Sequence, residues 1–305
     1  MKKIILKLIV FFALCVGIDQ LVGLTFGMMR EHARGGKTLH EKYISNTMQE
    51  ELIIMGSSRA VHHYVPSTLS DSLGISAYNI GSDGTGIIYN YAKLQTFRHR
   101  YQPKVILLEF TPSFDLLKGE SYLYDQQQIR SYYDFASVRP VLWHVDPMEK
   151  YKMRSQAYRY NSRIFEMGRE LLPVTGETQD GYVPLYGKMK HEPQLNTNYH
   201  DTLQIDSLRW HYFQQFVAEV KTTTHLIILV SPTYQGKLWG KQPKAAIDFI
   251  HDYCTRENIP FLDYHADTLF STDKQYWEDA CHLNTTGVDA YMKHIIPSLR
   301  TLLSQ

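Results

Sequence analysis

The segment Leu52-Ile53-Ile54-Met55-Gly56-Ser57-Ser58-Arg59 places an unbroken apolar run directly before a glycine and two hydroxyl side chains. A short apolar run that ends in glycine is typical of a strand buried on both faces of a parallel sheet. Ser57 and Ser58 follow where such a strand turns into a helix. We therefore expect the first strand of an α/β domain here, with a hydroxyl group at its carboxyl end.

Further apolar runs continue this pattern along the chain. We expect strands at 77–80, 105–108, 226–230 and 260–262, each with glycine or proline at or near a boundary. Between them, helical stretches are predicted at 87–99, 205–220, 244–256 and 286–303. Strands that alternate with helices indicate a parallel sheet covered by helices on both faces.

The composition excludes several classes of protein. The chain has 305 residues, of which 44% are hydrophobic, so it is long enough for a substantial core. Lys plus Arg is 32 and Asp plus Glu is 31, a net charge of +1 that gives no basic field for nucleic-acid binding. The three cysteines contain no CxxC pair, and a disulfide between Cys254 and Cys281 is left open.

The N-terminus predicts a membrane segment at 1–30. Lys2, Lys3 and Lys7 flank or interrupt an apolar stretch, Ile4 to Met29, which is long enough to span a bilayer if Asp19 lies near an interface. We favour a retained signal-anchor over a cleaved secretory signal or a buried N-terminal helix of a cytoplasmic domain. Either of the first two places the rest of the chain, 31–305, outside the cytoplasm.

The alternation of strands and helices is interrupted twice. Residues 31–50 are predicted as a polar connector. Residues 118–202 are predicted as an insertion after the third strand, with helical pieces over 121–172 and little periodicity beyond them. Such an insertion forms either a lid or substrate surface, or a merely structural helical layer.

Three polar clusters follow predicted strands or precede the last helix. A serine at a strand-to-helix turn is either an exposed nucleophile or an ordinary helix N-cap. Asp279 and His282 are spaced so that the carboxylate can orient the imidazole. Taken alone, the pair could equally be two polar loop residues. The glycine-rich loop 78–86 matches neither a Walker A loop nor a dinucleotide fingerprint, but its backbone N–H groups suit an oxyanion.

Taken in order, these clusters resemble the sequence blocks of the SGNH/GDSL superfamily of esterases and acyltransferases. The blocks are Gly56-Ser57-Ser58, Asn79-Ile80-Gly81-Ser82-Asp83-Gly84, and Asp279-x-x-His282-x-Asn284. The resemblance spans residues 53 to 284 and implies a flavodoxin-like, three-layer α/β/α fold with a central parallel sheet.

The same resemblance implies a catalytic role for each matching residue. Ser58 would be the nucleophile, His282 the general base and Asp279 the residue that orients it. The backbone N–H groups of Ser58 and Gly84 would bind the oxyanion. Ser57 stands where the family usually has aspartate, a departure also seen in membrane-anchored members that modify envelope polymers, and it is the second choice for the nucleophile.

The chain departs from the family in the block after the third strand. The family places an oxyanion-binding asparagine there, whereas this chain reads Glu109-Phe110-Thr111-Pro112-Ser113-Phe114-Asp115. The Ser113 hydroxyl could donate instead. Losing one oxyanion donor costs roughly 100–1000-fold in turnover, so weak hydrolysis, a different acyl acceptor or a pseudoenzyme all remain open.

Arg59, His62 and His63 are weaker candidates. Each could contact substrate from the helix after Ser58, but a solvated helix face or a salt bridge explains them at least as well. His62 and His63 could line the site, and Arg59 could hold an anionic substrate.

The sequence thus predicts a membrane-anchored, extracytoplasmic serine esterase or O-acyltransferase. Its substrate would be an acylated, most plausibly acetylated, envelope glycan or polysaccharide, and it would need no metal or organic cofactor. A membrane acyl-exporting protein is a candidate partner, and nucleic acid is not. The alternatives are a non-catalytic glycan-binding or assembly protein of the same fold, and a phosphate-directed hydrolase that uses loop 81–86 as an anion nest.

Overall fold

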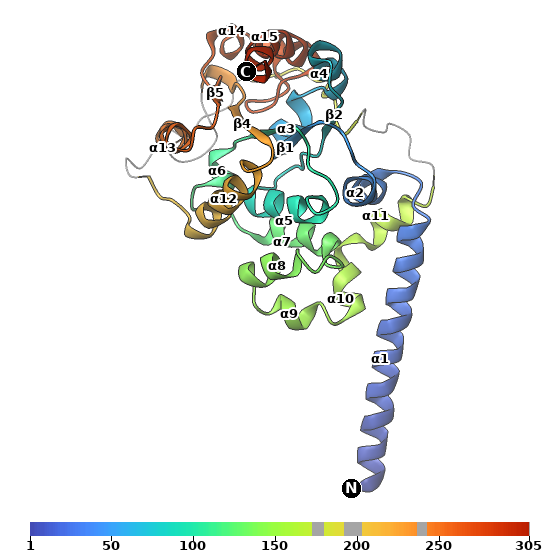
Figure 1. Ribbon diagram of the computed structural model, residues 1–305. Helices are drawn as coiled ribbons and strands as arrows, with labels where there is room; N and C mark the ends of the chain where they lie inside the picture. The colour runs from blue at the N-terminus through green and yellow to red at the C-terminus, as the bar shows by residue number, and fades with distance from the viewer. Residues whose placement is uncertain (173–179, 192–202, 237–242, 305) are drawn as a thin grey trace. The chain divides into compact units, whose positions relative to one another are not determined.

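A parallel sheet of five strands organises the larger part of the chain (Figure 1). The computed structural model describes residues 1–172, 180–191, 203–236 and 243–304. The strands are β1 (Leu52–Gly56), β2 (Ala77–Asn79), β3 (Val105–Glu109), β4 (His225–Val230) and β5 (Phe261–Asp263). Their spatial order is β2-β1-β3-β4-β5, the order of flavodoxin-like sheets. The predicted fold class is therefore confirmed.

Helices cover this sheet on two sides. α4 (Pro66–Leu73) and α15 (Thr285–Leu303) pack together on one side, and α3 (Ser58–His63) contacts α15. On the other side α5 (Ile87–Phe97) packs against α12 (Ser207–Val220), while α6 (Pro112–Asp115) contacts both of these and α13 (Pro243–Glu257). The central strands β1 and β3 are buried along their whole length, because helices shield both faces.

The remaining helices are short apart from the first. They are α1 (Lys2–Glu31), α2 (Gly36–Asn46), α7 (Leu123–Ile129), α8 (Arg139–Val145), α9 (Glu149–Lys152), α10 (Gln156–Tyr160), α11 (Ile164–Arg169) and α14 (Thr268–Ser271), with single 3₁₀ turns at Arg130–Tyr132, Asn161–Arg163, Tyr234–Gly236 and Lys274–Tyr276. The predicted helical pieces over 121–172 are therefore present. The predicted connector 31–50 is wrong in part, since it contains α2.

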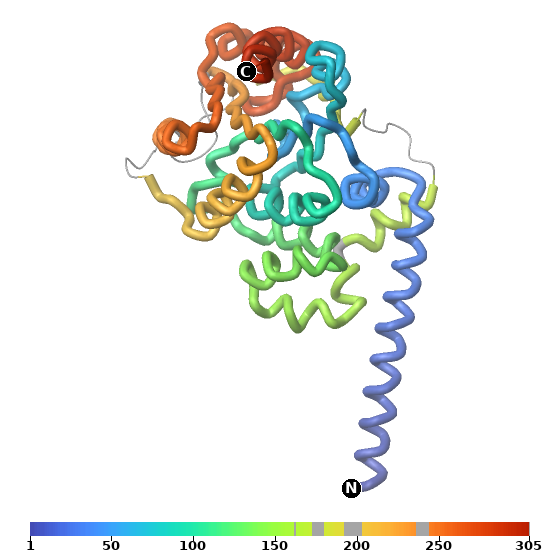
Figure 2. The backbone as a smooth tube through the Cα atoms, in the orientation of Figure 1, coloured from blue at the N-terminus to red at the C-terminus, as the bar shows by residue number. Residues whose placement is uncertain are grey.

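Chain contacts divide the molecule into two units, each built from two stretches of sequence. The colours of Figure 2 let these stretches be followed along the chain by residue number. Residues 1–47 and 129–177 form the first, which holds α1, α2 and α8 to α11. Residues 48–128 and 178–305 form the second, which holds the sheet. The predicted insertion 118–202 is thus shared between both units; its segments 173–179 and 192–202 lie outside the described residues.

α1 is long and apolar enough to cross a membrane, with a mean hydropathy of 2.2 over its most apolar window and no residue of that window buried. A retained anchor and a signal sequence both meet this criterion. The predicted N-terminal apolar helix is confirmed, and its orientation stays a prediction.

Gly56, the last residue of β1, allows the strand to turn tightly beside β3. Its φ is +142°, and a Cβ atom at this position would lie 2.7 Å from the backbone oxygen of Glu109. Any side chain would therefore push β1 away from β3 at the register pair Gly56–Glu109. The chain consequently leaves the sheet at Gly56 and begins α3 at Ser58.

Candidate active site

The carboxyl ends of β1, β2 and β3 bring the predicted motifs to one edge of the sheet. β1 leads into α3, which begins with Ser58. The loop after β2 is tied to the end of β1, because the Ser82 N–H donates to the Gly56 carbonyl over 3.1 Å. In open parallel sheets this edge is where ligands bind.

A continuous chain of hydrogen bonds joins Asp279, His282 and Ser58. His282 Nε2 lies 2.8 Å from Ser58 Oγ, and His282 Nδ1 lies 2.8 Å from Asp279 Oδ2 and 3.0 Å from Oδ1. The segment that carries His282 lies between β5 and α15, so residues more than 220 positions apart meet here. The distance from His282 to Ser58 falls in the range for a base that accepts the proton of a nucleophile, and the two distances to Asp279 are those of a group that orients the base.

Asp279 is held in its ionised form by the groups around it. Its Oδ1 atom accepts hydrogen bonds from the backbone N–H groups of Cys281, over 2.7 Å, and of His282, over 2.9 Å. Burial alone would raise the pKa of Asp279, but the hydrogen bonds and charge of His282, together with these N–H groups, lower it overall. The Nδ1–H group of His282 donates to Asp279, which leaves Nε2 facing Ser58 Oγ as the atom that can accept its proton.

The two adjacent serines have different surroundings. Ser57 is the N-cap residue of α3, yet its side chain makes no capping bond. It is 1% exposed, and its Oγ atom has no hydrogen-bond partner in the described part of the chain. Ser58 is half-buried and directed to His282, so the geometry favours Ser58 as the nucleophile.

The predicted oxyanion donors lie on two separate loops. Gly84, after β2, has a φ of +66°, a left-handed conformation that suits glycine. Ser113 is half-buried on α6, directly after β3. Their roles, and that of the Ser58 N–H, stay predictions.

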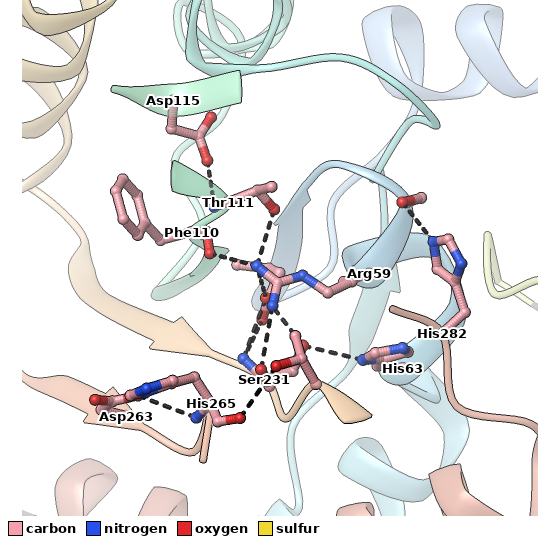
Figure 3. Close-up of polar contacts among 12 residues, drawn as sticks. Arg59, His63, Phe110, Thr111, Asp115, Ser231, Asp263, His265 and His282 are labelled. Carbon is pink, nitrogen blue, oxygen red and sulfur yellow. Dashed lines mark hydrogen bonds and ion pairs between the residues drawn. The ribbon is translucent and has the colours of Figure 1, made fainter. Parts of the chain in front are cut away.

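Arg59 is buried and binds groups of the protein itself, which contradicts its predicted role in substrate binding. The side chain is 3% exposed. Its guanidinium donates to the carbonyl groups of Phe110 and Ser231 and to the Thr111 hydroxyl, over 2.8–3.1 Å, and lies 3.2 Å from Glu109 (Figure 3). Arg59 therefore joins the ends of β1, β3 and β4.

Glu109 is the acceptor at the centre of this buried cluster. It accepts hydrogen bonds from the Ser231 N–H and hydroxyl groups and from the Tyr64 hydroxyl. Burial raises the pKa of Glu109, and the Arg59 charge and these donors offset only part of that rise. A buried carboxyl group needs such partners, so each donor is fixed in turn by its bond to Glu109.

His62 lies beside His282 and has no hydrogen bond to Ser58 among its described contacts. Its ring meets the His282 ring edge-on, with centroids 5.5 Å apart. His62 Nδ1 is 2.7 Å from the Val183 carbonyl, and Nε2 is 3.3 Å from Asp83. Burial alone would lower the pKa of His62, but its bonds to Asp83 and Val183 raise it overall. The predicted solvated helix face is wrong, since His62 is buried.

His63 links the buried cluster to the segment that carries His282. His63 Nε2 accepts a hydrogen bond from the Leu283 N–H over 3.0 Å, which leaves Nδ1 as the donor to Ser231 Oγ, also 3.0 Å away. Burial, with the nearby His282 and Arg59 charges, lowers the pKa of His63 well below its usual range, so the ring is neutral. His63 therefore positions His282, and no sequence motif indicated this role or that of Ser231.

The block after β3 contains a second buried carboxyl group, Asp115. It accepts a hydrogen bond from the Thr111 N–H over 2.6 Å, while its other oxygen has no partner among the described residues. Burial raises the pKa of Asp115 to about 8, and the nearby Asp125 charge adds to the rise. At neutral pH Asp115 is therefore largely a neutral acid within the turn that carries Ser113.

The cysteines form no disulfide: Cys254 is buried, Cys281 is half-buried, and neither is cross-linked. Burial raises the pKa of Cys254 to about 12, which makes it an inert packing residue. Among the described residues, no group of three or more His, Cys, Asp or Glu side chains could hold a metal ion.

Comparisons with solved structures find similar chains at low identity. A family two carbohydrate esterase from Clostridium thermocellum, in complex with cellohexaose, is 8% identical with a TM-score of 0.40; the match covers 83% of this chain and 65% of that one. A Bacteroides fragilis protein assigned as an acylhydrolase is 10% identical with a TM-score of 0.39, covering 86% and 94% of the two chains. A Bacteroides ovatus protein assigned as a GDSL-like lipase is 14% identical with a TM-score of 0.38, covering 85% and 55%.

The present chain therefore spans about two thirds or less of the carbohydrate esterase and of the GDSL-like lipase. No family model matches the sequence, and no curated protein sequence matches it significantly. The arrangement of its own side chains consequently carries the functional proposal.

Substituting His63 tests its positioning role. His63→Gln keeps an acceptor for the Leu283 N–H, whereas His63→Asn keeps only a donor for Ser231. We expect His63→Asn to slow labelling of Ser58 by a fluorophosphonate about 10- to 100-fold, because a small displacement of a catalytic group has costs of this order. His63→Gln should lose less at a similar melting temperature. Equal rates in both variants would show that His63 has only a packing role.

Asp115→Asn should change how stability depends on pH. The pKa of Asp115 is about 8 in the folded chain and about 3.9 when unfolded, so the folded state holds its proton more tightly and loses stability as pH rises between these values. The variant removes this loss and keeps an acceptor for Thr111. Its melting temperature relative to wild type should therefore be higher at pH 8 than at pH 5, measured by circular dichroism. A pH-independent difference would contradict an uncharged Asp115.

Proposed function

We propose that this protein is a serine esterase or O-acyltransferase that acts on an acyl ester, most plausibly acetyl, of a cell-envelope glycan. The observation that carries the proposal is the continuous hydrogen-bonded chain from Asp279 through His282 to Ser58. A nucleophile, a base and a group that orients the base, in this geometry, are the requirements of acyl transfer through a covalent intermediate.

In the first half of the reaction, Ser58 Oγ attacks the acyl carbonyl carbon while its proton passes to His282 Nε2. The resulting imidazolium is stabilised by ionised Asp279, and the oxyanion by the N–H groups of Ser58 and Gly84. His282 then gives the proton to the departing alcohol oxygen, the ester bond breaks and an acyl-Ser58 ester remains. These steps use no group beyond the chain and its substrate.

In the second half, water or a sugar hydroxyl attacks the acyl-Ser58 ester. His282 accepts the proton of that attacking group and returns it to Ser58 Oγ. Water gives hydrolysis, and a sugar hydroxyl gives transfer. Ser113 supplies a hydroxyl where the resembled family has an asparagine. Because an oxyanion forms whichever acceptor attacks, this difference bears on the rate of the reaction and not on the choice between water and sugar.

The proposed location is outside the cytoplasm, with α1 as an anchor. Lys2 and Lys3 begin α1, before its apolar run, and a basic start of this kind is retained on the cytoplasmic side. A protein held beside the membrane is suited to an acyl group delivered by a membrane acyl-exporting partner, which we include in the proposal.

Ser58→Ala should abolish covalent labelling by a fluorophosphonate probe and lower hydrolysis of an aryl acetate by at least about 1000-fold, since the nucleophile is lost. Ser57→Ala is the matched control. It removes the neighbouring hydroxyl, which is buried and unbonded, so labelling should persist. Mass spectrometry of the labelled peptide identifies the modified serine.

Labelling that disappears in Ser57→Ala and survives in Ser58→Ala would reassign the nucleophile. If the folded wild-type chain shows neither labelling nor turnover, the enzyme proposal fails, and a non-catalytic glycan-binding protein of the same fold takes its place.

Transfer can be separated from hydrolysis with the same aryl acetate. In the presence of envelope oligosaccharides, a transferase releases the phenol faster than acetate and yields an acetylated sugar detectable by mass spectrometry. A hydrolase releases phenol and acetate in equal amounts whether or not sugar is present. Ser58→Ala should yield no acetylated sugar, which controls for non-enzymatic transfer.

A further inference from the structure

The long helix α1 changes character at Asp19. Every residue from Met1 to Ile18 is exposed. From Asp19 onward, half-buried residues recur along the helix: Asp19, Val22, Gly23, Phe26, Gly27, Met29 and Arg30. Spacings of three and four residues are those of a helix that packs along one side. The second half of α1 is therefore docked within its own unit, whereas the first half is not.

The docked half makes specific contacts with α10 and its neighbours. Asp19 accepts hydrogen bonds from Ser155 Oγ over 2.7 Å, and from the N–H groups of Gln156 and Ala157 over 2.9 Å. One turn further along, a Cβ atom on Gly23 would lie 2.6 Å from Gln156 Cγ, so only glycine permits this approach. The ring of Phe26 stacks on that of Tyr160, with centroids 5.5 Å apart.

These contacts fix how deeply α1 can enter a bilayer. Asp19 and the backbone groups that it binds are polar, and placing them in hydrocarbon would be costly. Residues 2–18 span about 25 Å at about 1.5 Å per residue, slightly less than a hydrocarbon core of about 30 Å. The membrane surface must therefore lie close to Asp19 and, with it, to Ser155.

The residues just before Ser155 form a surface suited to that depth. We define the α9 surface as Met148, Lys150, Tyr151 and Arg154, all of which are exposed. Met148 is 55% exposed and Tyr151 is 56% exposed. The guanidinium of Arg154 lies over the Tyr151 ring, and the Lys150 ammonium over the Trp143 ring. Among the described residues, the carboxylates of Asp146 and Glu149 pair with Lys152 and not with Lys150 or Arg154.

We propose that α1 is retained, that only its residues 2–18 cross the membrane, and that the α9 surface rests on the bilayer and binds anionic phospholipid headgroups. Tyr and Trp side chains favour the membrane–water interface, and Lys and Arg place their charges among anionic headgroups while their stems cover apolar surface. This arrangement goes beyond the proposed chemistry and holds whether or not Ser58 is a nucleophile.

The depth of the α9 surface can be measured in the full-length chain, reconstituted in vesicles of phosphatidylcholine and phosphatidylglycerol. A fluorescent label is attached to Met148→Cys in a chain that also carries Cys15→Ala and Cys281→Ser, and is quenched by a lipid with a nitroxide headgroup. The matched control is Phe165→Cys on α11, which is 93% exposed. Gly168 of α11 contacts Met29, about 15 Å further along α1 than Asp19.

We expect about threefold stronger quenching at position 148 than at position 165, because only position 148 lies at the interface. Lys150→Gln with Arg154→Gln should reduce the quenching at 148 to its value in vesicles of phosphatidylcholine alone. Equal quenching at 148 and 165 would overturn the docking of the α9 surface. An intact mass showing that the mature chain lacks residues 1–19 would overturn the retained anchor.

Discussion

The buried carboxyl group of Glu109 is the interaction on which the geometry of the candidate site depends. It lies at the end of β3 and holds Arg59 from the same helix as Ser58, and Ser231 from the end of β4. Ser231 in turn binds His63, and His63 holds the backbone beside His282. An ionisable group in a core is stabilised only if its partners stay in place, so these groups are fixed together. Ser58 and His282 are thereby aligned through a shared polar core as well as through their own hydrogen bond.

The sheet could be predicted from the sequence because its strands are buried on both faces. The runs at 52–55, 105–108 and 226–230 carry no polar residue and end near glycine or proline. Short runs of this kind are typical of strands buried on both faces of a parallel sheet. α2 was missed because its sequence, GKTLHEKYISN, is mostly polar and buries Thr38, Glu41, Ile44 and Ser45 within its unit. A helix whose buried face is polar gives no hydrophobic periodicity, so tertiary contacts decide its structure.

The candidate site was predictable only as a set of residue types in the right order. Ser58, Asp279 and His282 could be named because each follows a strand or precedes a helix in a familiar block. The sequence block already ranked Ser58 above Ser57, and the structure adds the physical reason: the Ser58 hydroxyl faces His282, whereas that of Ser57 is buried without a partner among the described residues. The substrate-binding role predicted for Arg59 rested on its position next to Ser58. In the structure its guanidinium donates to carbonyl groups at the ends of β3 and β4, which the sequence alone does not place beside it.

The polar core also holds the segment after β3, where the resembled family has an asparagine and this chain has none. Thr111 and Asp115 hold the turn that carries Ser113, and Thr111 accepts a hydrogen bond from Arg59. The turn is therefore fixed by the same cluster that fixes α3, although its sequence differs from the block of the family that the chain resembles. A hydroxyl group at Ser113 can rotate, whereas an amide N–H from the backbone cannot, so the two proposed backbone donors must supply most of the preorganised stabilisation of an oxyanion.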